Sequence, residues 1–137
     1  GGGSAAQIIH EQFQHDSQIV GVESDAMIYD WAQNYFYSKG VKILLEDAFD
    51  YVRRAVENEW DYDLIVVDLF VDDKNPTWPE DFWENLKNMM NSTGVAIINT
   101  MSEEQAFKEL GNQLQHHGLI TQPWNEIKEN RVWVVKK

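Results

Sequence analysis

The chain has 137 residues, a length that fits one domain and leaves no room for two full lobes. Hydrophobic residues make up 43% of it, which is enough for a packed core and excludes an intrinsically disordered chain. Asp and Glu total 23 against 11 Lys and Arg, a formal net charge of −12. This charge argues against nucleic-acid binding. It favours a cationic partner such as a polyamine, a basic protein or a sulfonium cofactor, or serves solubility alone.

Several kinds of site are excluded by residues that the sequence lacks. The absence of cysteine excludes disulfides, thiolate metal sites and cysteine nucleophiles. The four histidines have no metal-site spacing, so no metal is expected. No apolar run approaches the ~20 residues that span a bilayer, and no secretion signal is visible. We therefore expect no membrane partner and a cytoplasmic location.

Strand and helix patterns alternate along the first half of the chain. The expected strands are residues 18–23, 41–45 and 63–68. The expected helices run from a cap at Asp25 to Phe36, and from Phe49 to Trp60. The third strand is apolar between its two acids, as in a sheet that is covered on both faces.

The second half continues this alternation and then changes. Two sequences typical of capping boxes, Thr77–Glu80 and Ser102–Gln105, precede helices with buried faces. The residues of these faces are Phe82, Leu86, Met89 and Met90, then Phe107, Leu110 and Leu114. The expected strands are 94–98, 118–121 and 131–135, the last two without a helix between them. The pattern predicts one α/β domain over residues 1–137: a three-layer sandwich with a mostly parallel sheet and an antiparallel C-terminal edge.

Ligands of open α/β sheets bind beyond the carboxyl ends of the strands, so the residues there are the candidates for a site. They are Gly1 to Ser4, Glu23, Glu46, Asp47, Asp68 and Asn99. Three acids end three successive strands, an arrangement that chance seldom produces. We therefore expect a ligand site at this edge of the sheet.

The glycines Gly1, Gly2 and Gly3 allow close backbone approach to a ligand at a helix N-terminus. The capping box Ser4–Gln7 then leads into an apolar helical stretch, although a Gly/Ser cloning linker is the alternative. Glu23 lies 20 positions after Gly3, close to the separation between a glycine turn and a ribose-binding acid. Its alternative role is that of an exposed strand-end acid.

The other two acids also have structural alternatives. Asp47 is well placed to cap the helix that carries Phe49, a role compatible with ligand binding. Asp68 follows four apolar residues, so we expect a partly buried carboxylate that accepts a proton or positions an amine. The alternative for Asp68 is an acid that merely begins a loop.

These motifs resemble, in order and spacing, the class I S-adenosylmethionine-dependent methyltransferase fold, and most closely its spermidine synthase (aminopropyltransferase) branch. The motifs are Gly-Gly-Gly-Ser, Val-Gly-Val-Glu-Ser-Asp, Leu-Glu-Asp-Ala, Tyr-Asp-Leu-Ile-Val-Val-Asp and the stretches 79–86 and 92–95. The resemblance covers residues 1 to about 100 and implies a Rossmann-like architecture. It also implies the cofactor S-adenosylmethionine or its decarboxylated form.

The resemblance assigns roles to individual residues. Gly1 to Gly3 would line the methionine part of the cofactor, and Glu23, beside Ser24, would bind the ribose hydroxyls. Asp47 and Ala48 would face the adenine. Asp68 would orient or deprotonate the attacking amine. The reaction would be attack of a nucleophile on a carbon bonded to a sulfonium, which needs positioning and proton removal.

The chain departs from that branch in two respects. Asp68 is not followed by the usual Ser and Asp-Pro, and only Asp72 or Asp73 could replace the second acid. The sequence also lacks the N-terminal β-hairpin lobe and the first strand of that fold. In the fold, this strand would lie between the strands at Ile19 and Leu64. Because unpaired backbone groups inside a sheet are costly, we expect residues before Gly1 to be missing, rather than a strand from a partner or a rearranged sheet.

The sequence therefore predicts a transferase that moves a methyl or aminopropyl group to a small amine or a basic protein. The alternative is a degenerate module of the same fold that binds cofactor or protein without catalysis. An acidic interaction protein that binds no nucleotide is the third interpretation. The resemblance also implies a homodimer.

Overall fold

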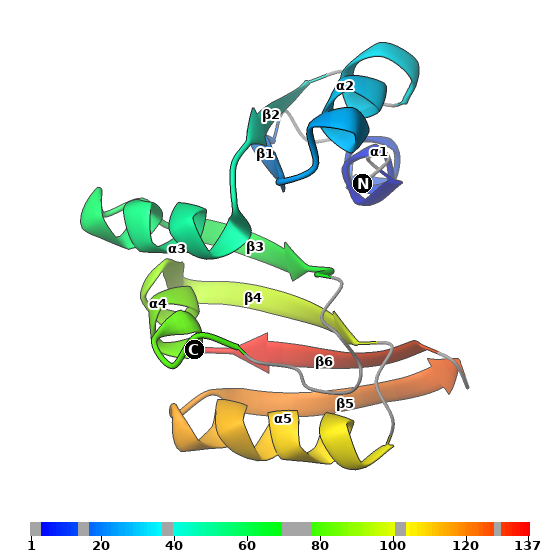
Figure 1. The fold of residues 1–137 in the computed structure, drawn as a ribbon. Coiled ribbons are helices and arrows are strands. Elements are labelled where there is room, and N and C mark those ends of the chain that lie inside the picture. Colours follow the sequence, from blue (N-terminus) through cyan, green and yellow to red (C-terminus); the bar gives the residue numbers. More distant parts are fainter. Residues whose placement is uncertain (1–3, 14–16, 37–39, 70–77, 101–103, 128–129) are drawn as a thin grey trace. The chain divides into compact units, whose positions relative to one another are not determined.

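The structure, a computed structural model, describes residues 4–13, 17–36, 40–69, 78–100, 104–127 and 130–137 (Figure 1). The chain divides into two compact units, residues 1–51 and 52–137. Strands and helices alternate along the chain until its last two strands, which follow one another without a helix, as the sequence predicts.

The first unit contains a two-stranded parallel sheet. Its elements are α1 (Ser4–Phe13), β1 (Ile19–Glu23), α2 (Ala26–Tyr35) and β2 (Val41–Leu45). The register runs without a shift from Ile19 opposite Val41 to Glu23 opposite Leu45, so both strands end at the same level. Helix α3 (Ala48–Glu57) follows β2 and leads into the second unit.

The second unit contains a four-stranded mixed sheet in the order β3-β4-β6-β5. Its elements are β3 (Tyr62–Val67), α4 (Phe82–Asn88), β4 (Met90–Thr100), α5 (Glu104–His116), β5 (Ile120–Ile127) and β6 (Asn130–Lys136). Strands β3 and β4 are parallel, whereas β6 is antiparallel to both β4 and β5. The predicted antiparallel C-terminal edge is confirmed.

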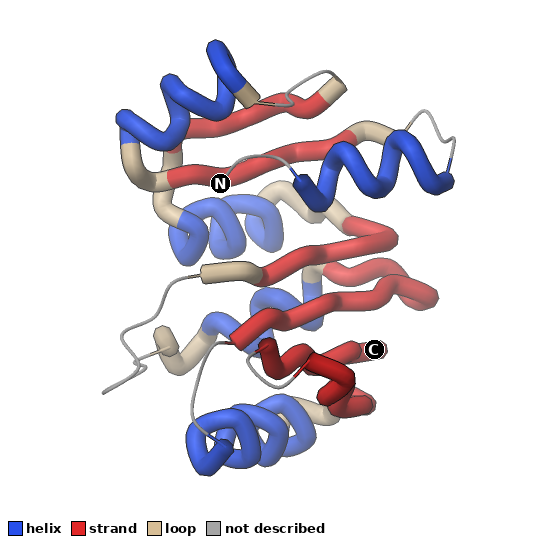
Figure 2. The backbone as a smooth tube through the Cα atoms, turned by 90° about the vertical axis from the view of Figure 1, so that its right-hand side faces the viewer, coloured by secondary structure: helices blue, strands red, loops and turns tan. Residues whose placement is uncertain are grey.

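Helix α5 covers one face of this second sheet (Figure 2). Trp133 on β6 stacks on Phe107 of α5, with ring centroids 4.5 Å apart, and its indole N–H donates to the Phe107 carbonyl at 3.2 Å. Ile98 is opposite Trp133 in register and is fully buried. Part of the core of this unit therefore lies between α5 and the central strands, and α4 adds the buried Phe82, Trp83 and Leu86.

The opposite face of the sheet is more open than the sequence suggests. Val67 is opposite Ile98 and is buried, but Leu64 and Val66, which alternate with it, are 39% and 44% exposed. The expectation that the third strand is covered on both faces is therefore wrong at Leu64 and Val66. The apolar composition of β3 could not distinguish a strand buried on one face from one buried on two.

Some predicted helix limits also change. Helix α3 ends at Glu57, and Glu59 with φ of 55° turns the chain, so Trp60 lies beyond the helix. Helix α4 begins at Phe82, several residues after the expected capping box. Helix α1 begins at Ser4, and within it the Gln7 side-chain amide donates to Glu11 at 2.8 Å. Thr77 and Ser102 lie outside the described residues.

The apolar residues of α2 recur at helical spacing, but most of that apolar face is exposed. Ala32 is buried, but Trp31 and Tyr35 are 42% and 78% exposed. The spacing of apolar residues therefore identified the helix correctly but overstated how much of its face is covered.

Among the described strands, β1 pairs with β2 and β3 pairs with β4, while β1 and β3 belong to different sheets. None of the described helices is long and apolar enough to cross a membrane. Within the same residues there is no cluster of three or more metal-binding side chains.

Candidate functional site

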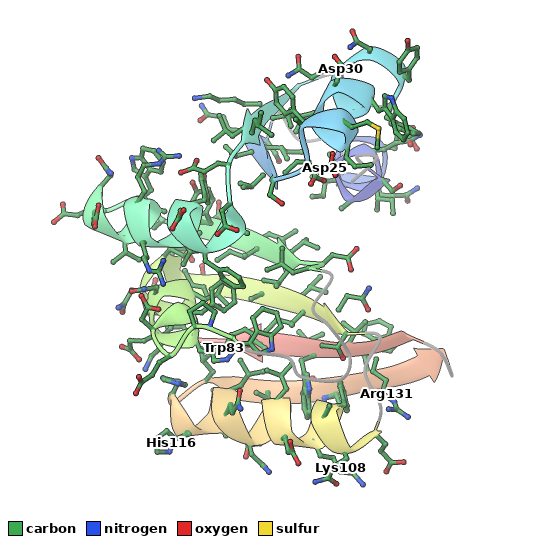
Figure 3. All side chains as sticks on the ribbon, in the orientation of Figure 1. Asp25, Asp30, Trp83, Lys108, His116 and Arg131 are labelled. Carbon is green, nitrogen blue, oxygen red and sulfur yellow. The ribbon has the colours of Figure 1, made fainter. Side chains whose placement is uncertain are left out.

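Glu23 is the last residue of β1 and begins the turn into α2. Its Oε1 accepts a hydrogen bond from the backbone N–H of Asp25 at 3.0 Å. Asp25 caps α2 as predicted, since its Oδ1 accepts from the N–H groups of Met27 (2.8 Å) and Ile28 (3.1 Å); Figure 3 labels it at the start of the helix. The turn therefore holds the Glu23 carboxylate at the carboxyl end of the strand.

Burial and backbone hydrogen bonds act in opposite directions on the Glu23 carboxyl. Partial burial raises its pKa, whereas the backbone N–H groups of Asp25 and Ser24 lower its pKa by stabilising the ionised form. An ionised carboxylate only accepts hydrogen bonds, which suits it to a pair of hydroxyl donors.

Asp47 ends the neighbouring loop and caps α3. Its Oδ1 accepts from the backbone N–H groups of Phe49 (2.8 Å) and Asp50 (3.2 Å), and its carbonyl accepts from Tyr51 at 2.9 Å. The predicted capping role is confirmed. Both described bonds to the side chain use Oδ1, so the cap leaves Oδ2 as an acceptor.

The two strand ends of the first unit are joined directly. The backbone N–H of Glu46 donates to the carbonyl of Glu23 at 3.0 Å, one step beyond the pairing of Glu23 with Leu45. This bond places the Glu23–Ser24 and Glu46–Asp47 segments side by side. Ser24 and Asp47 are exposed and Ala48 is half-buried, so these three predicted ligand residues are accessible.

The second unit carries the third acid, Asp68, directly after β3. Its carboxylate is exposed, and Oδ1 accepts a hydrogen bond of 2.9 Å from the side-chain amide of Asn99 on β4. The expectation of a partly buried Asp68 is therefore wrong. Asp68 extends past the end of β3, so it escapes the packing that buries Val67.

The bond between Asp68 and Asn99 was not expected from the sequence, although Asn99 is visible there as a strand-end residue. The signal was a polar side chain after the apolar run 95–98. Gly1, Gly2, Gly3, Asp72 and Asp73, which the sequence also places at the site, lie outside the described residues.

The described donors and acceptors fit an adenosyl group in the first unit. Ribose hydroxyls require hydrogen-bond acceptors of the kind that the Glu23 carboxylate supplies, and an exocyclic amine requires one of the kind that Asp47 supplies. The side chain of Ala48 is a single methyl group, which leaves space for a flat base.

The chain is similar in sequence to two kinds of transferase, although no family model matches it. It is 30% identical over 118 residues to the eEF1A lysine and N-terminal methyltransferase of Xenopus laevis, across 76% of this chain and 17% of that protein. It is 28% identical over 98 residues to Polyamine aminopropyltransferase 2 of Aquifex aeolicus (strain VF5), across 66% of this chain and 19% of that protein. The chain thus spans less than a fifth of the length of these curated relatives.

Solved structures resemble the fold over more of its length. Human Methyltransferase-like protein 13 in complex with SAH matches with a TM-score of 0.81 and 22% identity, covering 99% of this chain and 68% of that one. The fibrillarin pre-rRNA processing protein of Methanococcus jannaschii matches with a TM-score of 0.64 and 17% identity, covering 85% of this chain and 54% of that one. From these structures and the curated relatives, the chain has the Rossmann-like α/β fold of the class I S-adenosylmethionine-dependent methyltransferases.

Proposed function

We propose that this chain is the cofactor-binding part of an S-adenosylmethionine-dependent transferase that acts on an amine nitrogen. The observation that carries the proposal is the joined end of β1 and β2, where backbone N–H groups hold one oxygen of the Glu23 carboxylate and one oxygen of the Asp47 carboxylate. The fold of the chain and the kinds of relatives that it has support the same function.

In this proposal, each acid of the first unit holds one part of the cofactor. Glu23 accepts hydrogen bonds from the ribose hydroxyls, and Asp47 accepts one from the adenine amine while its Oδ1 continues to cap α3. When bound, the cofactor supplies a carbon bonded to a positively charged sulfur, which a nucleophile can attack. The protein contributes binding and orientation, which are the main requirements of such a transfer.

The proposed acceptor is an amine because of Asp68 and the charge of the chain. The exposed Asp68 carboxylate can orient an attacking amine and take its proton. A net charge of −12 attracts cationic amines, whether small molecules or basic proteins. The curated relatives are named for lysine, N-terminal and polyamine transfer, and all of these acceptors are amines.

Methyl transfer is the first candidate, because the human fold neighbour and the Xenopus laevis relative are both named as methyltransferases. Aminopropyl transfer is the second, and the similarity to the aminopropyltransferase favours it. A cytoplasmic location and a homodimer belong to the same proposal.

The first experiment is calorimetric titration with S-adenosylmethionine, its decarboxylated form and methylthioadenosine. Preference for the carboxylated cofactor supports methyl transfer, and preference for the decarboxylated form supports aminopropyl transfer. A folded sample that binds none of the three contradicts the proposal.

Two variants locate the binding site. Glu23→Ala should weaken cofactor binding by about 1–3 kcal/mol, because the ribose hydroxyls lose their acceptor. Asp30→Asn is the control, since it removes an equal charge from the exposed side of α2. Wild-type affinity in Glu23→Ala would exclude the ribose role.

A third variant tests the reaction. Asp68→Asn should retain cofactor binding and lower turnover in assays with radiolabelled cofactor, using purified eEF1A and butane-1,4-diamine as acceptors. Loss of cofactor binding in this variant would mean that Asp68 holds the cofactor or the structure and not the acceptor.

A further inference from the structure

Asn99 lies within a central strand of the sheet, whereas its partner Asp68 lies just beyond the end of an outer strand. Strand β4 lies between β3 and β6, and the backbone of Asn99 is opposite Val132 on β6. On the next residue, the Thr100 hydroxyl donates to the carbonyl of Arg131 at 3.2 Å. Asp68, by contrast, follows the last residue of β3 and is exposed.

The register explains why these two side chains meet. Parallel pairing runs from Leu64 opposite Val95 to Val67 opposite Ile98. One further step places Asp68 beside Asn99 on the same face of the sheet, where the Asn99 Nδ2 donates to the Asp68 Oδ1 at 2.9 Å. The contact is therefore a product of strand pairing and not of a chance loop position.

The chemistry of the pair fixes the orientation of the amide. An ionised carboxylate only accepts hydrogen bonds, so the NH₂ group of Asn99 must face Asp68. The Asn99 Oδ1 consequently points away, and it is buried without a hydrogen-bond partner among the described residues. A buried acceptor in this state is unfavourable for folding, so stability alone does not account for an asparagine here.

We propose that Asn99 is a positioning residue for Asp68: its amide holds one carboxylate oxygen and so directs the other toward an N–H of the acceptor amine. This inference rests on the proposed transferase function. Among the described residues, Oδ1 is the Asp68 oxygen that receives this bond, which leaves Oδ2 to accept from a substrate. An unconstrained aspartate would instead sample several χ1 rotamers and align the amine in only some of them.

The test replaces Asn99 in two ways. Asn99→Leu removes both the donor and the unpaired oxygen, and Asn99→Asp keeps the shape but replaces the donor with an acceptor. Thr100→Val is the matched control, because it removes a side-chain hydrogen bond at the same strand end without touching Asp68.

The first readout needs no ligand. Three-bond NMR couplings of Asp68 should report one dominant χ1 rotamer in the wild type and in Thr100→Val, and averaged rotamers in both Asn99 variants. Asn99→Leu should melt at the wild-type temperature or above it, because the buried unpaired oxygen is gone. An unchanged Asp68 rotamer in both Asn99 variants would overturn the proposal.

The second readout is turnover with the cofactor and acceptors named above. Both Asn99 variants should lower kcat by about tenfold with an unchanged KM for the cofactor, because an interaction that acts only on the reacting geometry affects kcat. Adding Asn99→Leu to Asp68→Asn should cost nothing further, since Asn99 acts through Asp68. Additive losses would overturn the proposal. Failure of the wild type to bind cofactor would instead refute the transferase function, while the rotamer result still tests the Asn99–Asp68 contact.

Discussion

Gly111 in α5 provides a stringent test of how the second unit is packed. The glycine is buried, and a Cβ added there would lie 2.4 Å from Cζ2 and 2.8 Å from Cη2 of Trp133. Carbon atoms in contact prefer about 3.5–4.0 Å, so Gly111→Ala forces the helix and the indole apart by about 1 Å. The helix approaches the sheet this closely only because the residue has no side chain.

The indole cannot easily move away. Trp133 is 8% exposed, stacks on Phe107 and donates its N–H to the Phe107 carbonyl. Overpacking of this kind costs about 1–3 kcal/mol, and weakening the buried N–H bond adds about 1 kcal/mol. Alanine regains only about 1 kcal/mol of helix propensity over glycine. We therefore expect a net loss of about 1–3 kcal/mol.

Thermal and urea denaturation followed by circular dichroism measure this loss. At about 4 °C per kcal/mol for a domain of this size, Gly111→Ala should lower Tm by about 4–12 °C. Gln113→Ala, on the exposed side of the same helix, should leave Tm nearly unchanged. In a Trp133→Phe background the alanine should cost less, because the smaller ring leaves space. A Gly111→Ala variant as stable as the wild type would refute this account of the packing.

Two further predictions concern the helix cap and an ion pair. Asp47→Ala should lower the free energy of unfolding by about 0.5–2 kcal/mol, because the α3 cap is lost. Asp47→Ser keeps a capping oxygen and should be nearly as stable as the wild type. If calorimetry then shows weaker cofactor binding in Asp47→Ser, the loss can be assigned to the adenine contact. Arg53 donates to Asp81 at 2.9 Å and holds the pKa of the Asp81 carboxyl below its ordinary range. A carboxyl whose pKa is lowered in the folded state stabilises the protein at pH values above its ordinary pKa, and this stabilisation is lost as the pH falls. The free energy of unfolding that Arg53→Ala loses relative to the wild type, measured by urea denaturation, should therefore become smaller as Asp81 is protonated. A deficit that stays constant from pH 7 to pH 3 would contradict this.

The order of elements could be predicted because each strand and helix has a local signature. Hydrophobic periodicity located the strands near Ile19, Val41 and Leu64 and the helices that follow them. Asp25 and Asp47 could be identified as caps because a cap needs only a carboxylate within three residues of free backbone N–H groups. The strand-end position of Glu23 followed from the same reasoning.

Contacts between distant segments could not be predicted in this way. The Asn99–Asp68 bond depends on the register of β3 against β4, which joins residues 31 positions apart. The exposure of Leu64 and Val66 depends on which face of the sheet the helices cover, and an apolar strand carries no mark of that choice.

The sequence by itself determined the alternation of strands and helices, the acids at the strand ends and the resemblance to a methyltransferase fold, because these features are written in short stretches of neighbouring residues. Only the tertiary structure decided that Asn99 holds Asp68 and that Gly111 seats Trp133 against α5. Both contacts join residues that are far apart in sequence, and strand register and helix packing, which bring them together, are properties of the whole folded unit.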